Sequence, residues 1–347
     1  MATSLRIAVD AMGGDFGPRV IVPALVTSLR KHPGVSALVI GEQRALDIAL
    51  SDKSVREVRA RIDTQYSDTV IADDDSPAAA IRSKQDSSMG LALQAVANGA
   101  ADACISAGHT GALMALGLVI LKTLPGISRP AICTTFPTSQ GRCYILDLGA
   151  NLDCSPAQLT QFAVLGSLTT QELDGIAKPR VRLLNVGAEA NKGNGTIKKT
   201  AEFLEAEPLV NYCGYVEGDG LFQGDAEVVV CDGFSGNVAL KATEGVARML
   251  SGMVADLFRS SWLNRLAEIL LGGSMVRLKA RLDPSRYNGA YLLGLNGVTV
   301  KSHGGADEIA FACALDVAIE GAKHNLPQVL SPILESKMHI NHTAKTH

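Results

Sequence analysis

The sequence is poor in aromatic residues and in unbalanced charge. Phe, Trp and Tyr make up 4% of the 347 residues, and there is one Trp. Single-stranded nucleic acids are usually bound by stacking bases on aromatic side chains, which makes that function improbable here. The 32 basic and 35 acidic residues give a net charge of −3, so the chain as a whole does not attract polyanions. We therefore expect no nucleic-acid partner.

The chain also lacks a disulfide pattern and a long apolar run. Its seven cysteines include no CxxC pair and are odd in number, which indicates free thiols in a reducing compartment. The longest apolar run, Ala112 to Leu121, is about half of a bilayer span and predicts a buried helix. The first residues do not follow the plan of a signal peptide. These features predict a cytoplasmic protein, and peripheral attachment to the inner face of the cell membrane stays open.

Several common catalytic motifs are missing. A P-loop GxxxxGK[ST] is absent, and the glycines at 13, 14 and 17 do not have the GxGxxG spacing that binds dinucleotides. Neither HExxH nor GxSxG occurs, and the histidines are not spaced with cysteines as metal ligands are. The sequence thus requires no metal and no cofactor.

What the chain does contain is one junction repeated five times. A short apolar strand runs into a glycine-bearing polar loop and then into a helix; the strands are predicted at Leu5–Asp10, Ala103–Ile105, Tyr144–Leu148, Val181–Val186 and Glu227–Cys231. This alternation predicts an α/β fold with three αβα layers and a mostly parallel sheet. In such a sheet the loops after the strands lie at the carboxyl edge, so we expect all five to converge on one edge.

These loops suit an anion. Glycine lets the backbone approach a ligand closely, and each following helix N-terminus offers free N–H groups, which together favour phosphate or an oxyanion. The alternative is that each loop needs glycine only for its turn. No linker or internal repeat divides the chain, so we expect residues 1–330 to form one unit with a helical protrusion around 246–286, followed by a tail at 331–347.

Taken in order, the loop motifs resemble those of the PlsX family over nearly the whole chain. They are Asp10-Ala-Met-Gly-Gly-Asp15, Ser106-Ala-Gly-His-Thr-Gly-Ala112, Leu146-Asp-Leu-Gly-Ala-Asn151, Lys192-Gly-Asn194, Val216-Glu-Gly-Asp219, Asp232-Gly-Phe-Ser-Gly-Asn237 and Leu293-Gly-Leu-Asn-Gly297 with Lys301-Ser-His-Gly304. The resemblance implies a phosphate acyltransferase that moves a long acyl chain from acyl carrier protein to inorganic phosphate. The acyl phosphate would supply a membrane glycerol-3-phosphate acyltransferase of phospholipid synthesis.

The same resemblance implies a homodimer and a fold related to isopropylmalate dehydrogenases and phosphotransacetylases. One departure concerns His109, since the family usually has Asn at this position. Imidazole can replace an amide as a hydrogen-bond donor, but it titrates near neutral pH.

For the reaction, phosphate is already an adequate nucleophile, so positioning and electrostatics should dominate. We expect Lys192, Asn237 and His109 to be catalytic. The expected binding residues for phosphate and thioester are Asp10, Gly13, Gly14, Asp15, Ser106, Gly108, Thr110, Gly111, Asp147, Asn151, Asn194, Asp232, Ser235, Gly236 and His303.

Each of these residues also has a structural interpretation. Lys192 could be a solvated loop lysine, Asn237 a helix cap and His109 the cap of its own helix. The aspartates could brace their loops, and His303 could be a structural histidine.

The predicted protrusion is apolar and basic. Apolar residues recur at helical spacing from Val246 to Leu271 with a break near Ser260 and Ser261, which predicts two helices. The segment from Arg259 to Arg286 contains six basic residues and two acidic ones. We expect this surface to meet an acidic carrier protein or anionic lipid; its candidate residues are Trp262, Arg265, Arg277, Lys279 and Arg281. The alternative is a dimer interface.

Two other functions remain open. A phosphotransacetylase that uses a CoA thioester would share the fold and the phosphate site. A non-catalytic scaffold that recruits lipid enzymes to a membrane would use the region of Trp262 alone.

Overall fold

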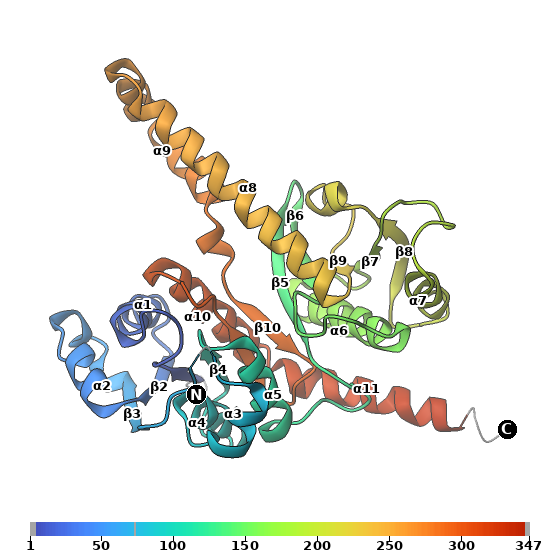
Figure 1. The fold of residues 1–347 in the computed structure, drawn as a ribbon, viewed down its shortest axis with the longest axis horizontal. Coiled ribbons are helices and arrows are strands. Elements are labelled where there is room, and N and C mark those ends of the chain that lie inside the picture. The colour runs from blue at the N-terminus through green and yellow to red at the C-terminus, as the bar shows by residue number, and fades with distance from the viewer. Residues whose placement is uncertain (1–4, 73, 344–347) are drawn as a thin grey trace.

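All five predicted strands belong to one eleven-stranded sheet (Figure 1). The computed structural model describes residues 5–72 and 74–343, without side chains for residues 265, 267–268, 279–282, 284 and 337–343. The strands are β1 (Leu5–Asp10), β2 (Val35–Gly41), β3 (Ile62–Tyr66), β4 (Ala103–Ser106), β5 (Ala131–Thr138), β6 (Gly141–Leu146), β7 (Arg180–Leu184), β8 (Asn211–Val216), β9 (Val228–Val230), β10 (Ala290–Leu293) and β11 (Val298–Lys301). Their order across the sheet is β3-β2-β1-β4-β11-β10-β5-β6-β9-β7-β8.

Helices cover both faces of this sheet, which confirms the predicted fold class. The α-helices are α1 (Pro18–Lys31), α2 (Gln43–Leu50), α3 (Pro77–Ser83), α4 (Ser88–Ala97), α5 (Thr110–Ile120), α6 (Pro156–Asp174), α7 (Gly195–Glu205), α8 (Gly233–Arg259), α9 (Trp262–Leu282), α10 (Glu308–Lys323) and α11 (Leu326–Thr343). Short 3₁₀ helices are η1 (Lys53–Val55), η2 (Arg59–Arg61), η3 (Gly218–Phe222) and η4 (Pro284–Tyr287).

The core follows the alternation of side chains along the strands. Ile7 and Val9 of β1 belong to one buried cluster with α1, α10, α6 and α11, while Ala8 between them belongs to another with α4 and α5. A third cluster lies under α8 and includes Phe136 and Ile145. Successive side chains of a core strand thus point to opposite, helix-covered faces of the sheet, as the two-residue period of a β-strand requires.

The sheet consists of two parallel sets that run in opposite directions. β3, β2, β1, β4 and β11 are parallel, and so are β6, β9, β7 and β8, but β10 and β5 pair antiparallel between the two sets. The expectation of one common carboxyl edge is therefore wrong. Three successive antiparallel pairings, β11 with β10, β10 with β5 and β5 with β6, reverse the direction of the second set, and local sequence patterns do not encode that reversal.

The strand register still brings the two sets of carboxyl ends together. Lys301 at the end of β11 pairs with Ala290 of β10. The next residue of β10, Tyr291, pairs with Cys133 of β5, and Cys133 pairs on its other side with Leu146 at the end of β6. The second parallel set is thus shifted along the strand direction relative to the first. As a result, the carboxyl ends of β11 and β6 lie at nearly the same height in the sheet. Loops from both halves can therefore face one site.

Local sequence signals set the start of α6. Ser155 caps α6 in a capping box with Gln158, and Pro156 is the first helical residue. The apolar run predicted as a helix is α5, and five of its residues are buried. None of the described helices combines the length and the apolar character needed to cross a membrane.

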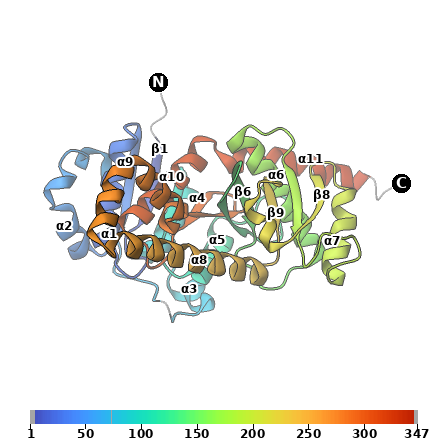
Figure 2. The same cartoon turned by 90° about the horizontal axis from the view of Figure 1, so that it is seen from above.

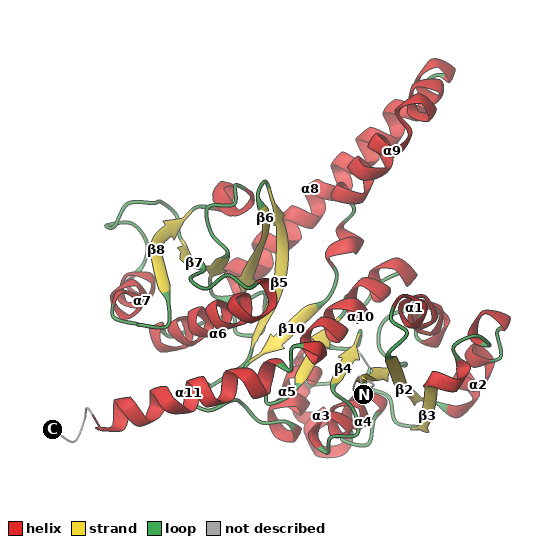
Figure 3. Ribbon diagram, turned by 180° about the vertical axis from the view of Figure 1, so that it is seen from behind, coloured by secondary structure: helices red, strands yellow, loops and turns green. Residues whose placement is uncertain are grey.

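The predicted protrusion is an antiparallel pair of helices, α8 and α9, that extends far from the sheet (Figures 1 and 2). The break falls where expected, between Arg259 and Trp262. At the other end of the chain, α11 runs along the outside of the second half (Figure 3). Its helix continues through residue 331, where we expected the tail to begin, because Leu334 is buried in the core.

Candidate active site

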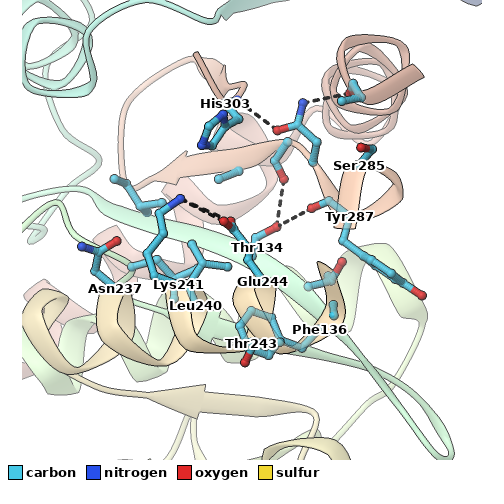
Figure 4. Close-up of a pocket in the computed structure, with 18 of the residues that line it drawn as sticks. Thr134, Phe136, Asn237, Leu240, Lys241, Thr243, Glu244, Ser285, Tyr287 and His303 are labelled. Atoms are coloured by element: carbon cyan, nitrogen blue, oxygen red, sulfur yellow. Dashed lines mark hydrogen bonds and ion pairs between the residues drawn. The ribbon is translucent and has the colours of Figure 1, made fainter. Parts of the chain in front are cut away.

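The two halves enclose a cavity of about 930 Å³ between β5, the first turns of α8, η4 and the loop after β11. Thr110 and Gly149 line it from the loops after β4 and β6, and Asn237 and His303 line it from α8 and the loop after β11. Figure 4 shows Asn237, Lys241 and Glu244 on α8, His303 across from them, and Phe136 next to Thr243. Loops from both halves of the sheet therefore share one cavity, which has both polar and apolar side chains in its lining.

The start of α8 presents Asn237 to this cavity. Asp232 caps the helix, because its Oδ1 accepts the Ser235 backbone N–H at 2.7 Å and its Oδ2 accepts the Ser235 hydroxyl at 3.1 Å. Asn237 lies in the following turn, so the alternative of Asn237 as the helix cap is wrong. A residue four positions later on a helix lies on the same face, which also places Lys241 in the cavity.

The polar part of the lining carries positive charge. Lys241 lines the cavity and donates to Glu244 at 3.1 Å, and Lys301 lines it from the end of β11. The Lys301 ammonium donates to the carbonyl oxygens of Ala107, at 3.2 Å, and Ser302. Lys241 and Lys301 thus line the same cavity as the Asn237 amide, and these donors suit an anion.

His303 completes the polar part of the lining as a neutral donor. Partial burial, followed by repulsion from Lys241, lowers the pKa of His303 below its usual range. Its Nδ1 accepts the Gly305 N–H at 3.0 Å, which assigns the proton of the neutral ring to Nε2. An Nε2–H group can donate to an oxyanion without adding charge.

The loop after β1 is fixed by Asp10 rather than exposed to the cavity. Asp10 is 1% exposed, and burial raises the pKa of its carboxyl group. It accepts the Ser106 hydroxyl at 2.6 Å and the Met12 N–H at 3.2 Å, and Ser106 accepts the Gly108 N–H at 3.0 Å. These bonds tie the loop after β1 to the loop after β4.

Glycine is required where these two loops meet. A Cβ on Gly13 would lie 2.5 Å from the backbone nitrogen of Gly108, and one on Gly14, whose φ is +79°, would lie 2.7 Å from the Gly304 carbonyl oxygen. The Asp15 N–H donates to the same Gly304 oxygen at 2.9 Å. The loops after β1, β4 and β11 therefore pack backbone to backbone, and the packing positions Thr110 and His303.

Asp147 organises the loop after β6 in the second half. It is buried, which raises the pKa of its carboxyl group. The carboxylate accepts the backbone N–H groups of Ile132 (2.9 Å), Ala150 (3.1 Å) and Asn151 (2.6 Å) and the Asn151 side-chain amide (2.9 Å). Gly236 packs on the Asp147 carbonyl oxygen with no room for a side chain. The Asp147 loop thereby holds the start of α8 in place.

Three other predicted residues have clear structural positions. His109 caps α5, since its Nδ1 accepts the Ala112 N–H at 3.1 Å, which is the structural alternative given above. Gly111 follows in the first turn, against the His109 ring. Asn194 caps α7 by accepting the Ile197 N–H at 2.9 Å.

Lys192 is not brought to the cavity. It is exposed in the loop between β7 and α7, and it is absent from the described residues that line the cavity.

Of the residues predicted to form the carrier or membrane surface, Trp262 is 73% exposed and Arg277 donates to the Ser274 hydroxyl at 2.9 Å. The side chains of Arg265, Lys279 and Arg281 lie outside the described residues.

The structure adds cavity residues that the sequence did not identify, namely Lys241, Glu244 and the aromatic pair Phe136 and Phe222. The spacing of four residues from Asn237 was an available signal for Lys241. Across the described part of the chain, no group of three or more His, Cys, Asp and Glu side chains is placed to hold a metal ion.

Comparison with known structures defines the class of this fold. A phosphotransacetylase from Streptococcus pyogenes superposes with a TM-score of 0.62 at 17% identity, covering 93% of this chain and 95% of that one. A branched-chain phosphotransacylase from Enterococcus faecalis V583 gives 0.58 at 13% identity over 92% and 99% of the two chains. The protein thus has the α/β fold of phosphotransacetylases.

Sequence comparison then gives the family. The chain belongs to the family described as "Fatty acid synthesis protein", whose model matches residues 5–329. A "Phosphate acyltransferase" of Alcanivorax borkumensis is 49% identical over 330 residues, 95% of this chain and 97% of the relative. One of Pseudomonas syringae pv. syringae is also 49% identical, over 95% and 96%. The resemblance to the PlsX family and the prediction of a transferase that joins acyl groups to phosphate are confirmed.

Proposed function

We propose that this enzyme transfers a long acyl chain from acyl carrier protein to inorganic phosphate. A phosphate oxygen bonds to the thioester carbonyl carbon, the carbon–sulfur bond breaks, and the carrier leaves as a thiolate that takes up a proton. The observation that carries this proposal is the polarity of the cavity. Asn237, Lys241 and His303 line a cavity whose walls also include apolar side chains such as Ile132, Phe136 and Leu240.

In this proposal the polar part of the lining performs two tasks. Lys241 and Lys301 attract phosphate and offset its charge while Thr110 and the loop amides hold it. The Asn237 amide and the Nε2–H of His303 donate to the oxygen that becomes negative in the tetrahedral intermediate. Phosphate at neutral pH needs no strong base, so fixed geometry supplies most of the rate enhancement.

We retain Lys192 as a further phosphate contact in this proposal. Its loop follows β7, which pairs with β9, and β9 leads into the turn before α8. The loop would have to move toward Asn237 for the exposed ammonium to reach the anion. We expect Lys192→Ala to lower kcat/KM for phosphate at least tenfold if the loop closes during turnover; normal kinetics would leave Lys192 as a solvated lysine.

The product determines which reaction follows. An acyl phosphate is a mixed anhydride and can acylate a hydroxyl group directly, as a membrane glycerol-3-phosphate acyltransferase requires. The proposed enzyme therefore supplies phospholipid synthesis from the cytoplasmic side of the membrane, without a cofactor.

The protrusion is the proposed meeting point with carrier, lipid or a second subunit. Met253, Leu257, Trp262, Ile269 and Leu270 are each more than half exposed. Apolar area of this extent on paired helices is typical of an interaction surface. If the basic residues of this region contribute, raising the salt concentration should weaken binding to carrier protein or to anionic vesicles. If binding does not depend on salt, apolar contacts account for it, as expected of a homodimer interface.

One assay separates the candidate functions. Purified protein is incubated with phosphate and either hexadecanoyl carrier protein or hexadecanoyl-CoA, and acyl phosphate is trapped with hydroxylamine. We expect product mainly from the carrier thioester. Preference for CoA would indicate a phosphotransacetylase, and vesicle binding without product would indicate a scaffold.

A further inference from the structure

The turn after η4 returns the chain from the protrusion to the cavity. Tyr287, Asn288 and Gly289 form this turn, and all three line the cavity. The Thr134 hydroxyl of β5 donates to the Gly289 carbonyl oxygen at 3.0 Å, and the Tyr287 carbonyl oxygen lies 3.5 Å from the same hydroxyl (Figure 4). Gly289 packs on α10 so closely that a Cβ would lie 2.8 Å from the Cα of Ala314. β5 and α10 therefore hold this turn in one place.

Asn288 uses both ends of its side-chain amide within the cavity lining. Its Oδ1 accepts the His303 backbone N–H at 2.9 Å. Its Nδ2 donates to the Ser302 hydroxyl oxygen and to the Ala310 carbonyl oxygen, each at 2.8 Å. A backbone N–H can only donate and a carbonyl oxygen can only accept, so these partners determine which end of the amide carries the oxygen. One amide thus joins the turn to the loop after β11 and to α10.

The position of the His303 ring depends on two hydrogen bonds of different kinds. The N–H of the residue before His303 and the carbonyl oxygen of the residue after it are bonded to the loops after β4 and β1. Asn288 bonds the backbone of His303 itself, and the Gly305 N–H donates to Nδ1 of the ring at 3.0 Å. The backbone bond and the ring bond together determine where the Nε2–H group lies.

We propose that Asn288 is a positioning residue that places the Nε2–H of His303 at the thioester oxygen. The inference rests on the proposed acyl transfer, in which His303 is the donor, and adds a residue that acts on the reaction through His303. Misplacing a catalytic group by about 1 Å can lower the rate about a hundredfold, so kcat should depend on this amide. Because Asn288 directly follows η4, the same amide also joins the chain that leaves the protrusion to the site.

The imidazole of His303 reports its own environment, so its position can be followed without substrate. Burial, then repulsion from Lys241, lowers the pKa of this ring. Lys301 acts on the pKa in the same direction, whereas the carboxylates of Glu244 and Asp15 act in the opposite one. A ring that moves toward solvent loses part of the burial penalty on its charged form. Its pKa should then rise toward the ordinary value of about 6.5.

Nuclear magnetic resonance titration of histidine-labelled protein measures this pKa, and His303→Gln assigns the signal. In Asn288→Ala we expect the His303 pKa to rise by about 0.5 or more. Thr134→Val is the matched control, because it weakens the hold of β5 on the same turn but keeps the amide, and it should leave the pKa unchanged. Asn288→Ser, with its shorter side chain, replaces Asn288→Ala if that variant does not fold. An unchanged His303 pKa in the folded Asn288 variant, or an equal rise in Thr134→Val, overturns the proposal.

Kinetics separate this inference from the proposed function. In Asn288→Ala kcat should fall about tenfold or more while KM for phosphate changes less than about twofold, because the misplaced donor acts only in the transition state. Asn211→Ala is the control, since the Asn211 amide also bonds a backbone carbonyl, that of Lys178 at 3.2 Å, but is not among the described cavity residues. Wild-type kcat in Asn288→Ala overturns the proposal. If the wild-type protein forms no acyl phosphate from any thioester, the proposed function fails, and the pKa measurement still decides whether Asn288 positions His303.

Discussion

The two halves of the sheet brace their loops with the same residue type in different ways. Asp10 ends β1 and Asp147 follows β6, and both carboxylates are buried. Asp10 accepts the Ser106 hydroxyl at the end of the neighbouring strand β4, whereas Asp147 accepts N–H groups of its own loop and of Ile132. The first carboxylate therefore joins two loops, and the second shapes one loop and anchors it to β5.

The largest expected effect is that of removing Asp147. Asp147→Ala leaves four N–H donors without their acceptor in a buried site, which should lower the free energy of unfolding by about 3–5 kcal/mol. Urea denaturation measures this loss. The exposed neighbour Asp153 provides the control, and Asp153→Ala should cost less than about 0.5 kcal/mol. Equal losses in the two variants would show that the Asp147 bonds contribute little.

A smaller effect is expected for Asp10, because it accepts fewer donors. Asp10→Ala should lower the free energy of unfolding by about 2 kcal/mol. A double-mutant cycle with Ser106→Ala should give a coupling energy of about 1 kcal/mol or more, since the two side chains share one bond. Strict additivity would mean that Asp10 does not join the two loops.

The smallest effect is the pH dependence of this brace. Burial raises the folded-state pKa of Asp10, while the unfolded carboxyl titrates near about 3.9. Between these pKa values the folded state binds more protons, so the contribution of Asp10 to stability is largest at low pH and is lost as pH rises through the folded pKa. The difference in unfolding free energy between wild type and Asp10→Asn should therefore decrease from pH 5 to pH 7. A difference that grows with pH contradicts this sign.

Local features of the fold were predictable from the sequence. β1 and the break before Trp262 lie where the residue patterns placed them, because strand alternation and helix caps act within a few residues. The opposite direction of the second parallel set was not predictable. It depends on three successive antiparallel pairings, one of which joins β5 to β10, about 160 residues apart in the chain.

The site was predictable only in part for the same reason. Asn237 and His303 belong to glycine-bearing motifs whose pattern is visible in the sequence, and both line the cavity. Phe222 becomes part of the site through contact with Phe136, 86 positions earlier in the sequence. His109 and Asp10 carry polar groups that could bind a ligand, but the structure uses these groups for a helix cap and a loop brace.

The central claim is that phosphate reacts among the polar side chains of the cavity between the two halves. The most direct measurement is kcat/KM for phosphate in Lys241→Ala and Asn237→Ala, compared with Lys199→Ala, an exposed lysine with the same i,i+3 pairing to a glutamate. The account predicts at least a tenfold loss in both site variants, about 1.4 kcal/mol of transition-state stabilisation, and less than a twofold change in the control. Wild-type kinetics in both site variants would contradict it.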